Sequence, residues 1–298
     1  MHIELVQIKT SDGLLLPGIF SAPKKTSAVA IYLHGNGSSS VFYKEDYHAL
    51  FRNALARRGI ALLQFNNRGA HYIKQLRVRK QGSEELKRYG MAYEKIKDCV
   101  YDIDAAVSFL RKRGYKTFYL TGLSTGANKI CVYHYYKPRN AISKNVLLGG
   151  GDDAGIYYHL LQKKKFWALL AKAKRRVSAG TGEDIMSELL PAEIFSYQGF
   201  YDIANPDGDY NVFPFYEVLK NTALSKKPLF RHFQSIKKPT LVVYGEHDEY
   251  AWGDVPRIVA LLKKRKPLFE YKIISGADHA GSEHPQELSL VIARWLAL

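Results

Sequence analysis

Short apolar segments that alternate with longer helical patterns constrain the fold of this chain more than any other feature. The short segments are rich in β-branched and aromatic residues, as strands are. They read IELVQIK, LLLPGIF, AVAIYLH, IALLQF, TFYLTG, NVLLGG, TLVVYG and FEYKIIS. Helical patterns between and after the later ones cover Ala92–Lys112, Thr125–Tyr136, Trp252–Lys264 and Pro285–Leu298. This alternation is typical of βαβ units and predicts an α/β fold, with a mostly parallel central sheet led by two antiparallel strands.

The alternation breaks once, between Gly151 and Lys238. Helical and aromatic-rich segments fill this stretch before the next strand pattern begins. Ordinary connections in α/β units are far shorter. We therefore expect residues 1–150 and 239–298 to form the core, and residues 151–238 to form a helical cap inserted after the sixth strand.

Composition predicts a globular protein without a membrane span. The chain has 298 residues, 46% of them hydrophobic, and Lys or Arg interrupts every apolar run before it reaches bilayer length. The amino-terminal MHIELVQIKT lacks the pattern of a secretory signal, so we expect a cytoplasmic protein. Cys99 and Cys131 sit in apolar helical patterns, which favours buried free thiols over a disulfide or a zinc site.

The charge is strongly basic, with 44 Lys and Arg against 28 Asp and Glu. A surplus of this size suits nucleic acid, an anionic membrane surface or an acidic substrate. The densest run, Lys163–Arg176, contains seven basic residues and matches no zinc-finger or RNA-binding consensus, so we do not expect nucleic acid as a partner. Its FWALL segment is flanked by cations, which leaves peripheral membrane contact open, although packing within its own domain is the favoured interpretation.

The pentapeptide Gly122-Leu123-Ser124-Thr125-Gly126 lies between a strand pattern and a helix pattern. A turn sharp enough to expose the serine hydroxyl strains the backbone at Ser124, and the flanking glycines let the strand and helix pack closely. A serine after a strand is otherwise a common helix cap. Its glycine context and the partners downstream make Ser124 the predicted nucleophile.

A serine nucleophile needs a base and a carboxylate that orients the base. Asp248 follows the strand TLVVYG, and His279 follows the strand FEYKIIS. The chain order Ser, Asp, His is the one that this sheet topology requires. Alternatives stay open: Asp248 as a helix cap, His284 as the base, and Glu246, Glu249, Asp152 or Asp153 as the carboxylate.

Two backbone amides are expected to form an oxyanion hole, one after the nucleophile and one on an early loop. Thr125 supplies the first. Asn36, in the loop His34-Gly35-Asn36-Gly37-Ser38, is the best-placed second donor, although this loop also reads as a plain turn. We expect His34 to be a structural hydrogen bonder and residues 66–69 (NNRG) to support the same region.

Together HGNGSSS, FNNRG, GLSTG, GEHDEY and GADH, in this order, resemble the α/β-hydrolase superfamily of serine esterases, lipases and peptidases. The resemblance covers nearly the whole chain outside the cap. A narrower resemblance, carried by MAYEKIKDCVYDIDAAVSFL and GLSTGANK, is to a branch related to fungal siderophore esterases. Departures are Leu123, where a histidine is common, and Asn66 and Asn67, where an aspartate is frequent; they bear on substrate identity.

The resemblance implies Ser124 as nucleophile, His279 as base, Asp248 as its orienter, and the Asn36 and Thr125 amides as the oxyanion hole. The expected activity is hydrolysis of a small carboxylic ester through an acyl-enzyme, without metal or organic cofactor. The basic surplus is compatible with an anionic ester. Alternative functions are a lipase or lysophospholipase at a membrane surface, an amide or C–C bond hydrolase, and a non-catalytic binding protein.

Overall fold

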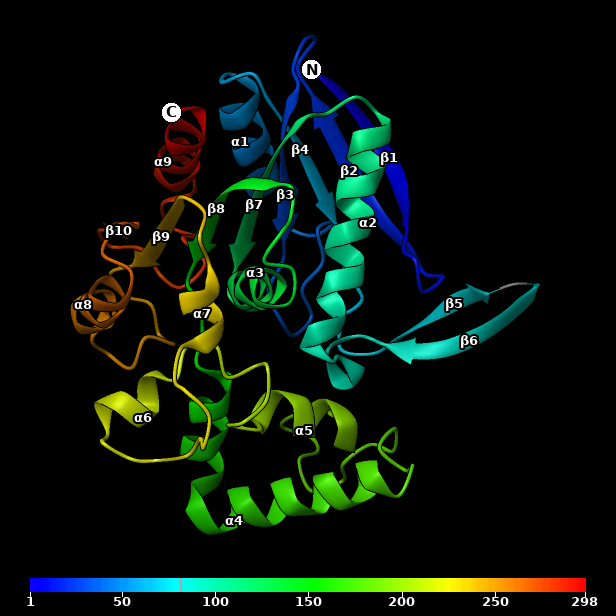
Figure 1. Ribbon diagram of the computed structural model, residues 1–298, viewed down its shortest axis with the longest axis vertical. Helices are drawn as coiled ribbons and strands as arrows, with labels where there is room; N and C mark the ends of the chain where they lie inside the picture. The colour runs from blue at the N-terminus through cyan, green and yellow to red at the C-terminus, as the bar shows by residue number, and fades with distance from the viewer. Residues whose placement is uncertain (81) are drawn as a thin grey trace.

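The computed structural model describes residues 1–80 and 82–298 and is organised around one eight-stranded sheet (Figure 1). Its strands are β1 (His2–Lys9), β2 (Leu15–Ala22), β3 (Ala28–Leu33), β4 (Ile60–Phe65), β7 (Thr117–Leu123), β8 (Ile142–Leu148), β9 (Thr240–Gly245) and β10 (Glu270–Ile274). They lie in the order β1-β2-β4-β3-β7-β8-β9-β10. Pairings β1–β2 and β2–β4 are antiparallel, and the others are parallel. The predicted fold class is confirmed.

The burial of each strand follows its place in the sheet. Strands β4 and β9 are buried along their full length, because helices cover both faces of a parallel sheet. Edge strand β1 instead alternates, with Val6 and Ile8 buried and their neighbours exposed. The amino-terminal segment therefore forms an edge strand with one buried face.

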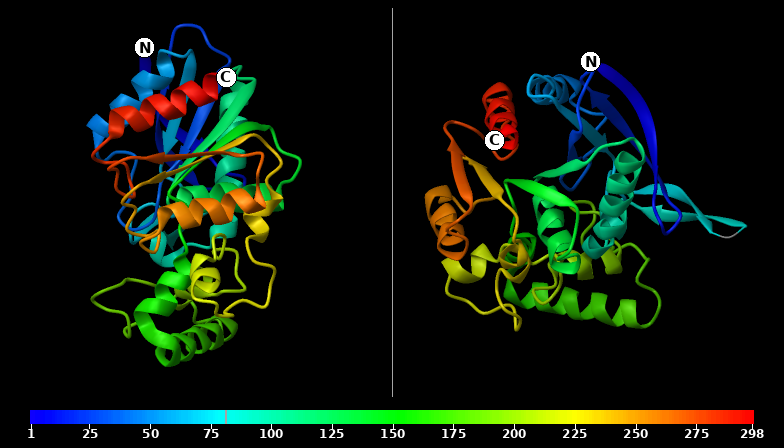
Figure 2. Two further views of the ribbon diagram at one scale, coloured as in Figure 1. Left: turned by 90° about the vertical axis from the view of Figure 1, so that its left-hand side faces the viewer. Right: turned by 45° about the horizontal axis from the view of Figure 1, so that its top comes forward.

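Helices pack on both faces of the sheet (Figures 1 and 2). The helices α1 (Glu45–Ala56) and α9 (Pro285–Ala297) contact each other and share one apolar core with the sheet. Helices α2 (Cys99–Lys112), α3 (Thr125–Tyr136) and α8 (Val255–Arg265) contribute to the core on the opposite face. Cys99 and Cys131 are buried free thiols, as expected.

The prediction of a helix from Ala92 to Lys112 is wrong at its start, because α2 begins at Cys99. Two short 3₁₀ turns, Met91–Tyr93 and Ile96–Asp98, precede α2, and the backbone is extended at Glu94 and Lys95. Glu94 leaves the helical path because its side chain is drawn into the interior, where it pairs with the buried Lys129. A buried ion pair of this kind overrides local helix propensity.

A hairpin of β5 (Lys74–Lys80) and β6 (Ser83–Tyr89) projects from the body and was not predicted from the sequence (Figure 1). Most of its described side chains are exposed, and most of these exposed side chains are charged, so the segment lacks the apolar alternation of a buried strand. Val78 is its inward anchor, and the Arg79 amide donates to the Gly13 carbonyl at 3.0 Å. The hairpin is thereby tied to the turn between β1 and β2.

Between β8 and β9 lie α4 (Asp153–Ser178), α5 (Tyr197–Ala204), α6 (Phe215–Leu219) and α7 (Arg231–Ser235). Figure 1 shows α4, α5 and α6 together at the lower end of the molecule, whereas α7 packs against α3. Phe195 and Phe200 are fully buried between α4 and α5, and both contact Tyr157 edge-on. We keep the name cap for residues 151–238; their status as a separate domain stays a prediction.

The segment Lys163–Arg176 of α4 has an exposed basic side and a buried apolar side. Lys163, Lys164 and Lys165 are exposed, whereas Phe166 and Leu170 of the FWALL segment are buried. Phe166, Leu169 and Leu170 of this segment therefore pack within the protein, whereas Trp167 is exposed. Among the helices of the described residues, none combines the length and the apolar character needed to cross a bilayer.

Arg68 joins three parts of the core through buried ionic hydrogen bonds. Its guanidinium donates to Asp102 of α2 at 2.8 and 3.0 Å and to Asp12 of the β1–β2 turn at 2.9 Å. Its backbone amide also donates to Asp102 at 2.9 Å. Nearby carboxylates offset the burial of this cation and raise the pKa of Arg68. The loop after β4 is thus held to α2 and to the first hairpin.

Replacing Asp102 by asparagine should lower the free energy of unfolding by about 3 kcal/mol, because it leaves the buried Arg68 charge without its closest partner. Glu84→Gln, which removes a carboxylate from the exposed pairs with Arg77 and Arg79, is the matched control and should leave stability unchanged. Urea unfolding followed by circular dichroism measures both. Equal stability of the two variants would contradict the prediction.

Candidate active site

The turn between β7 and α3 holds Ser124 in an unusual backbone conformation. Its φ is 56° and its ψ −124°, which a residue with a Cβ atom adopts only where the surroundings impose it. The Ser124 amide donates to the Leu148 carbonyl at 2.8 Å and ties the turn to β8. The half-buried Ser124 side chain therefore sits at the carboxyl edge of the sheet, at the amino end of α3.

Glycines make this turn possible because no Cβ atom would fit at them. A Cβ on Gly122 would lie 2.4 Å from Gly126, and one on Gly126 would lie 2.1 Å from the Leu33 carbonyl oxygen. A Cβ on Gly35 would lie 3.1 Å from the Ser124 Cβ. The backbones of β7, α3 and the loop after β3 therefore approach one another closely around Ser124, as the pentapeptide pattern predicts.

His279 and Asp248 are brought together at the same edge. The Nδ1 atom of His279 lies 2.9 Å from both carboxylate oxygens of Asp248, which is buried. The imidazole lies against Gly149, where a Cβ would be 2.9 Å from its Cε1. Since Gly149 follows Leu148, the acceptor of the Ser124 amide, the imidazole and Ser124 share the end of β8.

The second ring nitrogen of His279 is left available for chemistry. Its Nε2 is buried and has no hydrogen-bond partner among the described residues. A carboxylate at Nδ1 holds the proton there and directs the Nε2 lone pair outward. Asp248 also accepts the Tyr250 amide at 2.9 Å, which fixes the carboxylate. The arrangement suits a general base.

The other carboxylates weighed from the sequence bind elsewhere. Asp152 caps α4 by accepting the Gly155 amide and also accepts the Tyr216 amide, at 2.9 and 2.6 Å. Glu246 accepts from Ser275 and Gly276. The remaining two are Glu249, which accepts the His279 backbone amide at 3.1 Å, and Asp153, which accepts from the Asn128 side chain. None of them hydrogen-bonds the His279 ring within the described residues.

Two further alternatives from the sequence were Asp248 as a helix cap and His284 as the base. Asp254, and not Asp248, caps the helix α8 by accepting the Arg257 amide at 3.0 Å. His284 is the N-cap residue of α9, directly before Pro285. These positions leave Asp248 and His279 as the pair at the sheet edge.

The loop after β3 comes close to Ser124 and is held by buried polar contacts. His34 Nδ1 lies 2.8 Å from the Gly35 carbonyl, and His34 Nε2 accepts the Asn67 amide at 3.2 Å. Burial lowers the pKa of His34 well below its usual value, so this imidazole is neutral and structural. Asn66 accepts the Val41 amide at 2.8 Å and supports the same loop.

Two backbone amides near Ser124 are candidate oxyanion donors. The Asn36 amide makes no hydrogen bond within the described part of the chain, and it follows Gly35, which packs against Ser124. Thr125 is the first residue of α3, where an amide has no helical acceptor. Their function as an oxyanion hole stays a prediction.

Three buried residues beside the site were missed from the sequence. Lys129 Nζ lies 2.6 Å from Glu94 Oε1 and donates to Asn67 at 3.1 Å. Tyr210, a cap residue, donates to Glu94 at 2.8 Å and lies 3.5 Å from Asn36 Oδ1. The available signal was a lysine within the apolar helix TGANKICVYHYY. Its partners come from distant segments that no local pattern connects.

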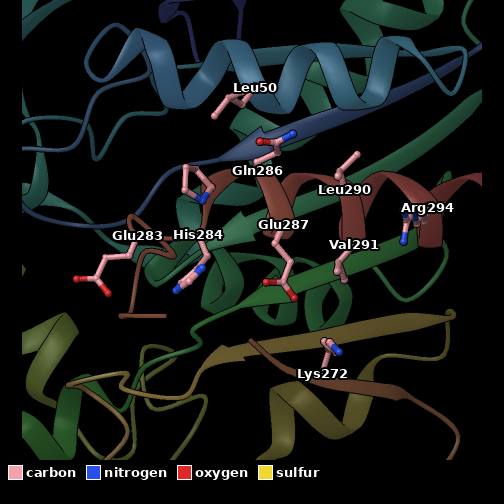
Figure 3. Close-up of a pocket in the computed structure, with 10 residues that line it drawn as sticks. Leu50, Lys272, Glu283, His284, Gln286, Glu287, Leu290, Val291 and Arg294 are labelled. Atoms are coloured by element: carbon pink, nitrogen blue, oxygen red, sulfur yellow. The ribbon is translucent and has the colours of Figure 1, made fainter. Parts of the chain in front are cut away.

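The cavities described in the structure lie outside this site. A hollow of about 740 Å³ is lined mainly by α9, together with Leu50 and Lys272 (Figure 3). A second, of about 20 Å³, is lined by residues that include Gly122 and Ser289. Neither includes Ser124, Asp248 or His279 in its lining. Over residues 1–80 and 82–298, no group of three or more His, Cys, Asp or Glu side chains could hold a metal ion.

Comparisons with known proteins agree with this architecture. Est1E from Butyrivibrio proteoclasticus, with ferulic acid bound, superposes with a TM-score of 0.63 at 17% identity, over 98% of this chain and 97% of that one. The esterase Pf2001 from Pyrococcus furiosus gives 0.58 at 20% identity, over 99% and 90%. A proline iminopeptidase from Mycobacterium smegmatis gives 0.56 at 16% identity, over 98% and 97%. The chain has the α/β-hydrolase fold.

Sequence comparison adds one match. The family model described as "Protein of unknown function (DUF1749)" matches residues 87–296, more than two thirds of the chain. Among the curated proteins, none matches the sequence.

Gly126→Ala should destabilise the protein by at least about 3 kcal/mol, because its methyl group would overlap the Leu33 carbonyl at the heart of the turn. Gly151→Ala is the matched control, since a Cβ there meets nothing within 4 Å, and it should leave stability nearly unchanged. Thermal unfolding of both variants checks this. A Gly126→Ala variant as stable as the control would mean that the backbones can separate.

Proposed function

The chain belongs to the family described as protein of unknown function (DUF1749), and we propose that it is a serine hydrolase that cleaves carboxylic esters through Ser124, His279 and Asp248. The observation that carries this proposal is the buried Asp248–His279 pair, whose free Nε2 lies at the end of β8, to which the strained Ser124 turn is hydrogen-bonded. Nucleophilic catalysis by serine requires these three parts.

In the first half of the reaction, Ser124 Oγ attacks the ester carbonyl carbon while His279 Nε2 takes the hydroxyl proton. Asp248 keeps the imidazole in the productive tautomer and stabilises the imidazolium that forms. The carbonyl oxygen becomes an oxyanion, which accepts the Asn36 and Thr125 amides. Each such donor contributes about 2.7 to 4 kcal/mol to transition-state stabilisation in comparable sites. The carbon–oxygen bond then breaks, and the departing alkoxide takes the proton from His279.

In the second half, His279 removes a proton from water, and the hydroxide attacks the acyl-serine carbonyl. The tetrahedral intermediate collapses, the carboxylic acid leaves, and Ser124 regains its proton from His279. The same two amides stabilise the second oxyanion. Every proton transfer in this scheme is carried by His279, so the scheme uses only groups of this chain and the two substrates, ester and water.

Ester hydrolysis is preferred to the alternatives for two reasons. Two of the structures named above are Est1E with ferulic acid bound and the esterase Pf2001, although they resemble this chain in fold alone. The buried side of FWALL also argues against a membrane-inserting helix and thus against a lipase at an interface. Amide hydrolysis, favoured by the likeness to a proline iminopeptidase, is the second candidate. Membership of the branch related to fungal siderophore esterases stays a prediction.

The wild-type protein should hydrolyse p-nitrophenyl esters, and Ser124→Ala should lower kcat by roughly four to six powers of ten with an unchanged fold. The loss follows from removing the nucleophile. A chain-length series from acetate to palmitate, followed by nitrophenolate absorbance, measures both. A fluorophosphonate probe should label the wild type and not the variant. Labelling that survives Ser124→Ala would overturn the assignment, and activity on amides alone would favour the second candidate.

Asp248→Asn should lower kcat by about 10⁴, because an amide at this position holds the imidazole in the wrong tautomer. Glu246→Gln should have little effect, since Glu246 binds Ser275 and Gly276 instead of the ring. Steady-state kinetics with the best p-nitrophenyl ester compares them. The proposal fails on this point if Asp152→Asn or Asp153→Asn slows the reaction more than Asp248→Asn does.

A further inference from the structure

One carboxylate beside the candidate site has no role in the proposed mechanism. Asp153, the first residue of α4, is half-buried and accepts from the Asn128 side-chain amide at 3.1 Å. Asn128 lies one turn along α3 from Ser124, whose carbonyl accepts the Asn128 amide at 3.4 Å. The Asn128 side chain also donates to the Gly151 carbonyl at 2.9 Å. Asp153 is therefore held close to the nucleophile turn, where the cap begins.

Asp153 differs from other buried carboxylates in its partners. Asp102 pairs with Arg68, Glu94 pairs with Lys129, and Asp152 accepts two backbone amides. Asp153 makes no ion pair with Lys or Arg within the described residues, in a chain that has 44 of them. Desolvation and the neighbouring carboxylate of Asp152 raise its pKa to about 7. Among the described residues, no Lys or Arg therefore pairs directly with the negative charge of Asp153.

Tyrosines and another carboxylate surround the same place. Tyr157 follows Asp153 by one turn of α4, Tyr210 contacts Glu94 and Asn36 beside the site, and burial raises the pKa of both hydroxyls. Tyr157 also donates to Glu193 at 3.5 Å. Carboxylates and tyrosine rings are the groups that bind ammonium ions in proteins. The buried Nε2 of His279 lacks a hydrogen-bond partner among the described residues, so this nitrogen is free to meet a ligand.

We propose that Asp153 determines substrate specificity by binding a positively charged amine of the ester substrate. This inference rests on the proposed function, because it names the substrate class of the same site. It reverses the expectation drawn from net charge, since the exposed lysines of α4 face solvent whereas the groups around Asp153 are anionic or neutral. An ion pair with Asp153 offsets part of the free-energy cost that the ammonium group pays when it leaves water for the site.

The test compares four small esters in the full-length protein. Ethyl butanoate is neutral, β-alanine ethyl ester carries an amine on the acyl side, 2-(dimethylamino)ethyl propanoate carries one on the alcohol side, and monoethyl succinate is anionic. Wild type should favour at least one amine ester over ethyl butanoate by about tenfold or more in kcat/KM. Asp153→Asn should abolish this preference, so that the ratio of kcat/KM for the amine ester to kcat/KM for ethyl butanoate falls to about one.

Asp184→Asn is the matched control, because it removes an exposed carboxylate from the cap and should leave all four values unchanged. A second measurement needs no variant: n-butylammonium should inhibit ethyl butanoate hydrolysis by the wild type at about tenfold lower concentration than butan-1-ol. Equal inhibition, a preference that survives Asp153→Asn, or a preference for monoethyl succinate overturns the inference and leaves the proposed function intact. If the protein hydrolyses none of the four esters and no member of the p-nitrophenyl series, that result contradicts the proposed function and this inference with it.

Discussion

The close approach of three backbone segments around Ser124 is the constraint on which the rest of this site depends. Gly126 packs against the Leu33 carbonyl, Gly122 packs against Gly126, and the Ser124 amide reaches across to β8. A positive φ at a serine is costly, and it persists only because these neighbours leave no other path. Strands β3, β7 and β8 must therefore be parallel neighbours before the turn can form.

Buried charges then connect this turn to the cap. Lys129 lies on α3 just after the turn, pairs with Glu94, and through Asn67 reaches the loop that carries His34 and Asn36. Glu94 also accepts from Tyr210 of the cap. Such a network is costly to bury, and the Nδ2 atom of Asn67 finds no hydrogen-bond partner among the described residues. The network couples the core, the loop after β3 and the cap at one place, beside the proposed nucleophile.

The distribution of charge matters more for recognition than its total. The chain carries a formal net charge of +16, yet Lys163, Lys164 and Lys165 lie on the solvent side of α4. Exposed charges of this kind act at long range and are screened by salt. A partly desolvated carboxylate such as Asp153 acts at contact distance, where screening is weak. Under the proposal for Asp153, these two fields of opposite sign would apply to different stages, the approach of a substrate and its binding.

The sequence by itself determined the sheet, the turn at Ser124 and the two loops that carry Asp248 and His279, because these follow from local signals. Strands β3, β4, β7 and β9 and helix α3 match their apolar patterns closely, since residues that are neighbours in sequence form them. The prediction from the sequence missed the β5–β6 hairpin and α1, and it placed the start of α2 too early. Only the tertiary structure decided that Asp248 faces His279 while Asp152, Glu246 and Glu249 bind elsewhere, because side-chain pairing across the sheet edge depends on loop geometry. The same holds for Glu94, Lys129, Tyr210 and Asp153, whose neighbours are brought together by the packing of distant segments.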